Sequence, residues 1–204
     1  MPEVNVQVDA ADDDGLVYDV VAEGAGGTLD KTLDFIQAGN VDNTNKRSCF
    51  VRFASVTIPV GATITVAYLS FCARATANVV VRTNIWGNDT NVPASPAGAI
   101  AFWALVKTAN QLIWDGIGAW IADTWYNSDS IVAIIQELVD SYDYSAGLAM
   151  QFMWWNDASD VGARRSANTW EVGDHSKATK LHIEYTGGRI QRAPAVSGVP
   201  SAHF

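Results

Sequence analysis

The sequence predicts an all-β fold, a jelly-roll-type β-sandwich with one short α-helix and an irregular C-terminal extension. Several short segments alternate apolar and polar residues, which is the period of a strand with one buried face. Gly, Pro and Asn separate these segments, as turns require. Only one stretch has apolar residues at helical spacing. The chain has 204 residues and 49% hydrophobic content, so one domain can bury a sizeable core.

The first strands follow from alternation and turn residues. Residues 3–9 place Val4, Val6 and Val8 on one face, and residues 16–21 form a second short strand. Strands at 48–53 and 62–75 are separated by Pro59 and Gly61. The segment 62–75 is apolar on both faces, so we expect it to be a central strand.

The second half of the chain contains further strands and the helix. Strands are predicted at 78–86, 101–107, 111–114, 148–155 and 180–185. Ser128 or Asp129 is the expected N-cap of the helix. The apolar residues Ile131, Ile134, Ile135, Leu138 and Val139 then follow at helical spacing and should plug an open end of the sandwich.

The chain divides into a sandwich over residues 1–186 and a C-terminal extension over residues 187–204. The extension has no periodicity and is rich in Gly, Pro, Ser and Ala. We expect it to dock on a neighbouring subunit or partner. The residues expected to make this contact are Arg189, Ile190, Arg192, Pro194, Val196 and Phe204.

Composition restricts the partners. The formal net charge is -9 and the 13 Lys and Arg residues are scattered, so we expect no nucleic-acid partner. The N-terminus lacks the pattern of a signal peptide, so we expect no export by the classical route. No apolar run reaches the roughly 18 residues of a membrane span, so we expect no association with a membrane. Cys49 and Cys72 are too few for a disulfide framework, but the sequence leaves open whether they are bridged.

No catalytic pattern is present. The three histidines, His175, His182 and His203, belong to no nucleophile or metal motif, and no phosphate-binding loop is found. We therefore predict a protein that is not an enzyme and has no cofactor. A structural calcium ion is the one exception considered, with Asp12, Asp13, Asp14 and Asp42 as candidate ligands in two acidic loops.

Eight tryptophans are the most unusual feature of the composition. Trp154 and Trp155 are adjacent and must point to opposite faces of a strand, so one of them is expected on an outer face or an interface. Trp170 follows Arg164 and Arg165 in a loop-like stretch. These five residues are the candidates for glycan stacking or an interface, although packing in the core is the competing interpretation.

Two blocks of sequence resemble a known family. The hairpin IPVGATITVAYL at 58–69, preceded by the strand that starts at Arg47, resembles DNRLRE-type β-sandwich proteins, which are themselves similar to carbohydrate-binding modules. The block WYNSDSIVAIIQELVDSYDYSAGL at 125–148 resembles stand-alone phage and prophage relatives, although Tyr144 replaces their usual tryptophan.

The resemblance implies a non-enzymatic accessory structural protein of a phage virion, such as a capsid decoration protein, head fibre or tail-associated module. Its implied location is the virion, after synthesis in the host cytoplasm. The implied partners are the major capsid protein or another virion protein, and further copies of the chain in a homo-oligomer. The alternative is a carbohydrate-binding module that recognises host-surface or extracellular glycans through exposed Trp residues.

Overall fold

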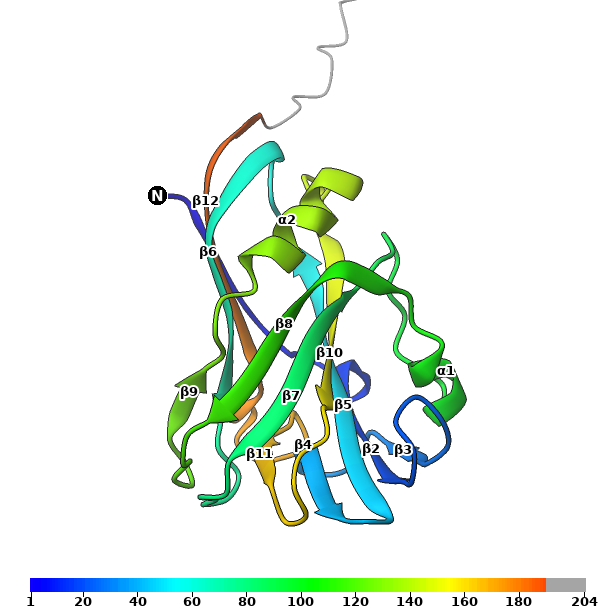
Figure 1. The fold of residues 1–204 in the computed structure, drawn as a ribbon. Helices are drawn as coiled ribbons and strands as arrows, with labels where there is room; N and C mark the ends of the chain where they lie inside the picture. Colours follow the sequence, from blue (N-terminus) through cyan, green and yellow to red (C-terminus); the bar gives the residue numbers. More distant parts are fainter. Residues whose placement is uncertain (190–204) are drawn as a thin grey trace, which may run out of the picture.

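The computed structural model describes residues 1–189, with the backbone alone described at Arg189. Two antiparallel sheets pack face to face, as the sequence predicts for an all-β sandwich (Figure 1). The four-stranded sheet has the order β1-β12-β6-β9, and the eight-stranded sheet follows the path β11-β4-β5-β10-β7-β8, with β2 and β3 joined to it through β5.

The elements in chain order are β1 (Glu3–Gln7), η1 (Ala11–Asp13), β2 (Asp14–Val20), β3 (Thr28–Asp30), β4 (Phe35–Asp42), β5 (Asn45–Val56), β6 (Val60–Cys72), β7 (Val81–Asn88), α1 (Ala99–Trp103), β8 (Lys107–Ile117), β9 (Trp125–Asn127), α2 (Val132–Ser141), β10 (Leu148–Asn156), β11 (Arg164–Asn168), η2 (His175–Lys177) and β12 (Lys180–Arg189).

β6 lies between two neighbours, as predicted, but its two apolar faces have a different cause. Ile64 faces the core, whereas further along the strand Ala67, Leu69 and Phe71 do so. The register with β12 shifts between Glu184 and Tyr185, so one residue of β6 is left over and the inward face changes from even to odd positions. The strand therefore looks apolar on both faces although each half buries only one.

α2 closes one end between the two sheets (Figure 1), and Ile131, Ile134, Ile135 and Leu138 are buried there, as the apolar stripe predicts. The predicted N-cap is wrong. Ile131 occupies that position and its side chain makes no capping bond, while the Ser130 hydroxyl accepts from the Val132 amide at 3.4 Å. The Ser128 hydroxyl instead accepts from the Leu69 amide of β6 at 3.1 Å and donates to the Asp129 carbonyl, so it ties the approach to the helix onto the sheet.

The prediction of a strand at 101–107 is wrong, because this segment contains the end of the short helix α1 and the residues that lead into β8. α1 covers a second, smaller core on the outer face of the eight-stranded sheet. Phe102 is fully buried there beside Trp155, and Trp103 and Trp86 pack at its margin. The apolar residues at 101–106 thus cover this second core and do not form one face of a strand.

The two sheets meet along one side. Ala73, just after β6, forms an antiparallel bridge with Ala167 of β11, and the Arg74 amide donates to the Ser166 carbonyl at 2.9 Å. We call this junction the seam. Cys49 of β5 and Cys72 of β6 are buried free thiols in different sheets, which resolves the question that the sequence left open.

β12 extends three residues beyond the predicted end of the sandwich at residue 186. Gly187 pairs with Ala62, and Arg189 pairs with Val60. Of the residues expected to dock, Arg189 therefore belongs to β12 by its backbone. Ile190, Arg192, Pro194, Val196 and Phe204 lie outside the described residues.

Candidate functional site

The outer face of the four-stranded sheet carries a row of polar and aromatic side chains, which we call the polar-aromatic face. Antiparallel pairing aligns Asn5, His182 and Tyr68 across β1, β12 and β6. One row along, Gln7, Lys180, Ser70 and Asn127 are aligned across all four strands. Because alternate residues of a strand share a face, the two rows face outward while Leu181, Ile183 and Leu69 fill the core.

His182 is the centre of this face. Its ring stacks on Tyr68 with the centroids 4.8 Å apart and the planes 27° apart. The Nδ1 atom lies 2.7 Å from Asn5 Oδ1, and the Nε2 atom lies 3.3 Å from Glu184 Oε1. Both ring nitrogens therefore have an oxygen partner, which fixes the ring and holds Tyr68 against it.

The edge of the face carries the exposed tryptophan. Trp125 of β9 is 38% exposed, and Lys180 Nζ lies 4.2 Å from the centroid of its ring. Beside it, the Ser70 hydroxyl and Asn127 Oδ1 are 2.6 Å apart. A depression of about 340 Å³ lies between Asn5, Gln7, Tyr68, Ser70, Lys180 and His182.

This combination suits a polyhydroxylated ligand. Amide, hydroxyl and ammonium groups supply donors and acceptors, and the aromatic rings of Tyr68 and Trp125 supply flat apolar surface against which a sugar ring can stack.

The tryptophans predicted from the sequence are in the interior. Trp154 is 2% exposed in the main core, where its Nε1 atom donates to Thr83 Oγ1 at 2.9 Å. Trp155 does point to the outer face of the eight-stranded sheet, but the second core covers it to 8% exposure. The Lys107 ammonium lies 3.3 Å from the Trp155 ring centroid, and burial lowers the pKa of that lysine. Trp155 therefore lies on an outer face, as expected for one of this pair, but the second core covers it.

Trp170 is half-buried and packs against the main core. His175 covers one face of its ring, with the centroids 4.0 Å apart and the planes 13° apart. Trp170 is therefore engaged by both the main core and His175, and it does not line the depression of the polar-aromatic face.

The two adjacent arginines have different environments. Arg165 is fully buried, and its guanidinium group donates to the carbonyls of Ile117 and Gly118, which ties β11 to the end of β8. Arg164 is half-buried and lines a depression on the outer face of the eight-stranded sheet. Only Arg164 is therefore placed to meet a ligand.

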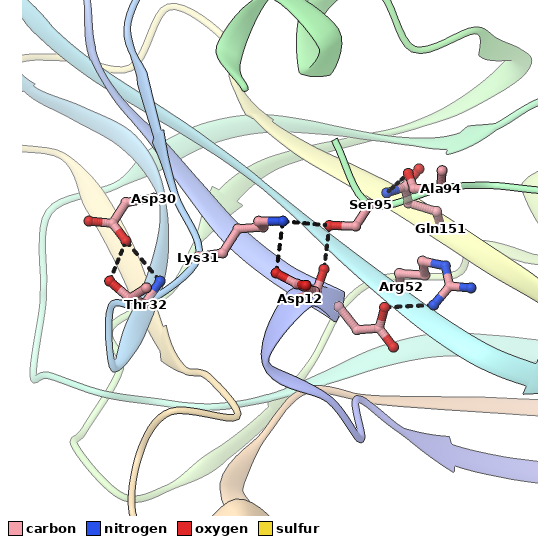
Figure 2. A network of polar contacts seen from close by, with 9 residues as sticks. Asp12, Asp30, Lys31, Thr32, Arg52, Ala94, Ser95 and Gln151 are labelled. Atoms are coloured by element: carbon pink, nitrogen blue, oxygen red, sulfur yellow. Dashed lines mark hydrogen bonds and ion pairs between the residues drawn. The ribbon is translucent and has the colours of Figure 1, made fainter. Parts of the chain in front are cut away.

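The carboxylates considered as calcium ligands each contact different partners within the protein. Lys31 Nζ lies 2.8 Å from Asp12 Oδ1, and Figure 2 shows the Lys31 ammonium group joined by dashed lines to both Asp12 and Ser95. Asp13 pairs with Arg52 at 2.6 Å. Asp42 accepts from the amide and hydroxyl of Thr44 in a distant turn. Among residues 1–189, no three His, Cys, Asp or Glu side chains gather closely enough to hold a metal ion.

Asp14 instead forms a buried carboxyl pair with Glu171. Asp14 is 0% exposed, and its Oδ2 atom accepts from the Trp170 amide at 3.1 Å. Burial, and next the charge of Glu171, raise the pKa of Asp14 from 3.8 to about 8. A raised carboxyl pKa can mark a catalytic acid, but a side chain with no exposed surface cannot reach a substrate.

The polar-aromatic face was missed in the sequence because its residues are ordinary strand residues. The signal that could have found it is the run Lys180, His182 and Glu184, whose alternation with apolar residues predicts an outward row. Nothing in the sequence shows that Tyr68 and Trp125 lie beside this row, because that depends on strand order.

A scan against protein-family models matches no family, and a search of curated proteins finds no significant match. The resemblance to the DNRLRE-type group therefore stays a prediction. Within the described residues, no helix is both long enough and apolar enough to span a membrane.

Proposed function

We propose that this chain is a non-enzymatic accessory structural protein of a phage particle. The observation that carries the proposal is the sequence resemblance of residues 58–69 and 125–148 to stand-alone phage and prophage sandwich proteins. These two blocks lie together in the fold, because the hairpin forms β6 and the second block supplies β9 and α2, which both contact β6. The two blocks that carry the resemblance thus pack against each other.

The test is the presence of the chain in particles. Mass spectrometry of particles purified through a density gradient should find the protein at a fixed ratio to the major capsid protein. Chain truncated after residue 189 should fold normally and fail to enter particles if residues 190–204 dock. Absence of the full-length chain from washed particles would refute the proposal.

A second candidate function is glycan recognition, and a specific observation favours it. The polar-aromatic face combines a stacked Tyr68–His182 pair, an exposed Trp125 and a depression lined by amide and hydroxyl groups. Sugars are bound by this mixture of flat aromatic surface and directional polar groups. A particle protein with such a face would attach to host-surface or extracellular glycans.

Glycan-array binding followed by calorimetry tests this function. Tyr68→Ala and Trp125→Ala should each weaken glycan binding about two- to tenfold, because loss of a stacking partner costs about 0.5–1.5 kcal/mol. Ile113→Ala is the control, since Ile113 is an apolar side chain, 59% exposed, on β8 of the other sheet. Equal binding by all three variants would exclude the face as the glycan site.

A further inference from the structure

Three arginines converge on one depression of this acidic protein. Arg47 of β5, Arg164 of β11 and Arg74 beside the seam line a pocket of about 330 Å³ together with Phe35, Gln37 and Val41. The chain has a net charge of -9, so such a cluster is opposite in sign to the protein as a whole. The arginines come from distant parts of the sequence and meet only in the fold.

Strand pairing places two of these arginines on either side of a glycine. Gly39 of β4 pairs with Arg47 on one side and with Arg164 on the other, so the three residues form one row. Gly39 has a φ of 131°, and a Cβ at this position would collide with the Ala163 carbonyl oxygen and the Arg164 backbone. The missing side chain lets the backbone of β11 approach β4 closely, so that Arg164 and Arg47 flank the same residue.

Arg47 and Arg164 have no carboxylate within 4.0 Å among the described residues, whereas Arg74 pairs with Asp34 at 2.5 Å. Arg47 Nη1 donates to Gln37 Oε1 at 2.8 Å, which fixes the direction of its guanidinium group. Burial, and next the charge of Arg164, lower the pKa of Arg47. Arg47 and Arg164 thus have no carboxylate in direct contact, although Asp34, the partner of Arg74, also lines the pocket, and Asp19 and Asp42 act on Arg47 from further away.

The other residues that line the pocket indicate which kind of ligand would fit it. The ring of Phe35 lies 5.9 Å from the Arg47 guanidinium carbon and, with Val41, gives the pocket an apolar wall. Planar guanidinium groups bind carboxylate, sulfate and phosphate oxygens through paired N–H donors. An anionic group with an attached apolar or sugar body would use both the donors and the wall.

We propose that this pocket binds an oxyanion, a carboxylate, sulfate or phosphate group of a ligand, between the guanidinium groups of Arg47 and Arg164. The site is separate from the polar-aromatic face, because the two depressions share no lining residue. Its test is therefore independent of the functions proposed above.

The experiment titrates the full chain at low ionic strength with sodium glucuronate, sodium sulfate and sodium phosphate, with sodium chloride as the salt control. The arginine Nε–Hε signals in nitrogen–proton NMR spectra report binding. At least one of the three oxyanions should shift the Arg47 and Arg164 signals to saturation. The anion that does so assigns the ligand as carboxylate, sulfate or phosphate.

Two variants and one control locate the site. Arg164→Gln should weaken binding at least tenfold, because a hydrogen bond to a charged group contributes about 1.5–3 kcal/mol. Val41→Glu keeps all three arginines but places a carboxylate in the pocket, so it should abolish binding. Arg82→Gln removes the same charge from an exposed position on β7 and should leave affinity unchanged. The proposal is overturned if no oxyanion saturates, or if Arg82→Gln weakens binding as much as Arg164→Gln.

Discussion

Replacing Asp14 with Asn should stabilise the protein at neutral pH. Asp14 Oδ1 and both carboxylate oxygens of Glu171 are buried without a hydrogen-bond donor among the described residues. Burial, the charge of Glu171 and a hydrogen bond with its side chain raise the pKa of Asp14, so Asp14 holds its proton at neutral pH. An Asn side chain keeps the acceptor for the Trp170 amide and supplies an N–H donor to Glu171 without any need for that proton.

The size and pH dependence of the effect follow from the pKa of Asp14. In the folded protein this pKa is about 8, against 3.8 for an ordinary Asp. The folded state therefore binds more protons than the unfolded state between these values, and the free energy of unfolding falls as pH rises through that window. At pH 7 the cost of holding Asp14 protonated is up to about 4 kcal/mol, and at pH 4 it is less than about 1 kcal/mol.

Urea denaturation of Asp14→Asn and of the parent chain, followed by tryptophan fluorescence at pH 7 and pH 4, measures the difference. The gain should be large at pH 7 and nearly absent at pH 4. Asp42→Asn is the control of opposite sign, because hydrogen bonds from Thr44 lower the pKa of Asp42 and its removal should not stabilise the protein at pH 7. A gain for Asp14→Asn that is equal at both pH values would refute the protonation of Asp14 at neutral pH.

Three further predictions concern stability. Arg52→Met should lower the free energy of unfolding by about 3–5 kcal/mol, because it leaves the Asp13 carboxylate, 6% exposed, without its partner; a loss below about 1 kcal/mol in urea would contradict this. Gly39→Ala should cost about 3 kcal/mol in the same assay, since the φ is unfavourable and a Cβ has no room, and an unchanged midpoint would show that β4 and β11 can separate freely. Glu137→Ala removes the acceptor of the Ala109 and Asn110 amides, so hydrogen exchange at these two amides should accelerate while exchange in β10 stays slow.

Prediction from the sequence succeeded for segments whose surroundings are the same along their whole length. β1 and the first part of β12 alternate regularly, because each buries one face, and their first residues, Glu3 and Lys180, were predicted correctly. The segment 101–107 was misread because α1 is short and covers a local core, so its apolar residues follow neither a helical nor a strand period over enough length. The N-cap was misassigned because Ser128 binds the distant Leu69 amide, a contact that local pattern cannot reveal.

The candidate sites were predictable only in part. Arg164 was identified from the sequence, but its neighbour Arg165 looked equivalent, although one faces a pocket and the other lies in the core. Strand alternation predicts that the two differ without saying which one is outside. Arg47 and Trp125 gave no local signal, since each acquires its neighbours through strand order and through the pairing of residues far apart in the sequence.

The seam has a mechanical consequence. Arg74 follows Ala73 on one side of the junction, and Arg164 lies on β11 on the other side, so the pocket spans the line where the two sheets join. An oxyanion held between Arg47 and Arg164 lies on the eight-stranded sheet, so a ligand that also reaches Arg74 would act as a staple across this line, in parallel with the backbone hydrogen bond from Arg74 to Ser166. Force that pulls the sheets apart would then have to break the ligand's bonds and the bridge together, so occupancy of the pocket should make the domain resist tension as well as heat.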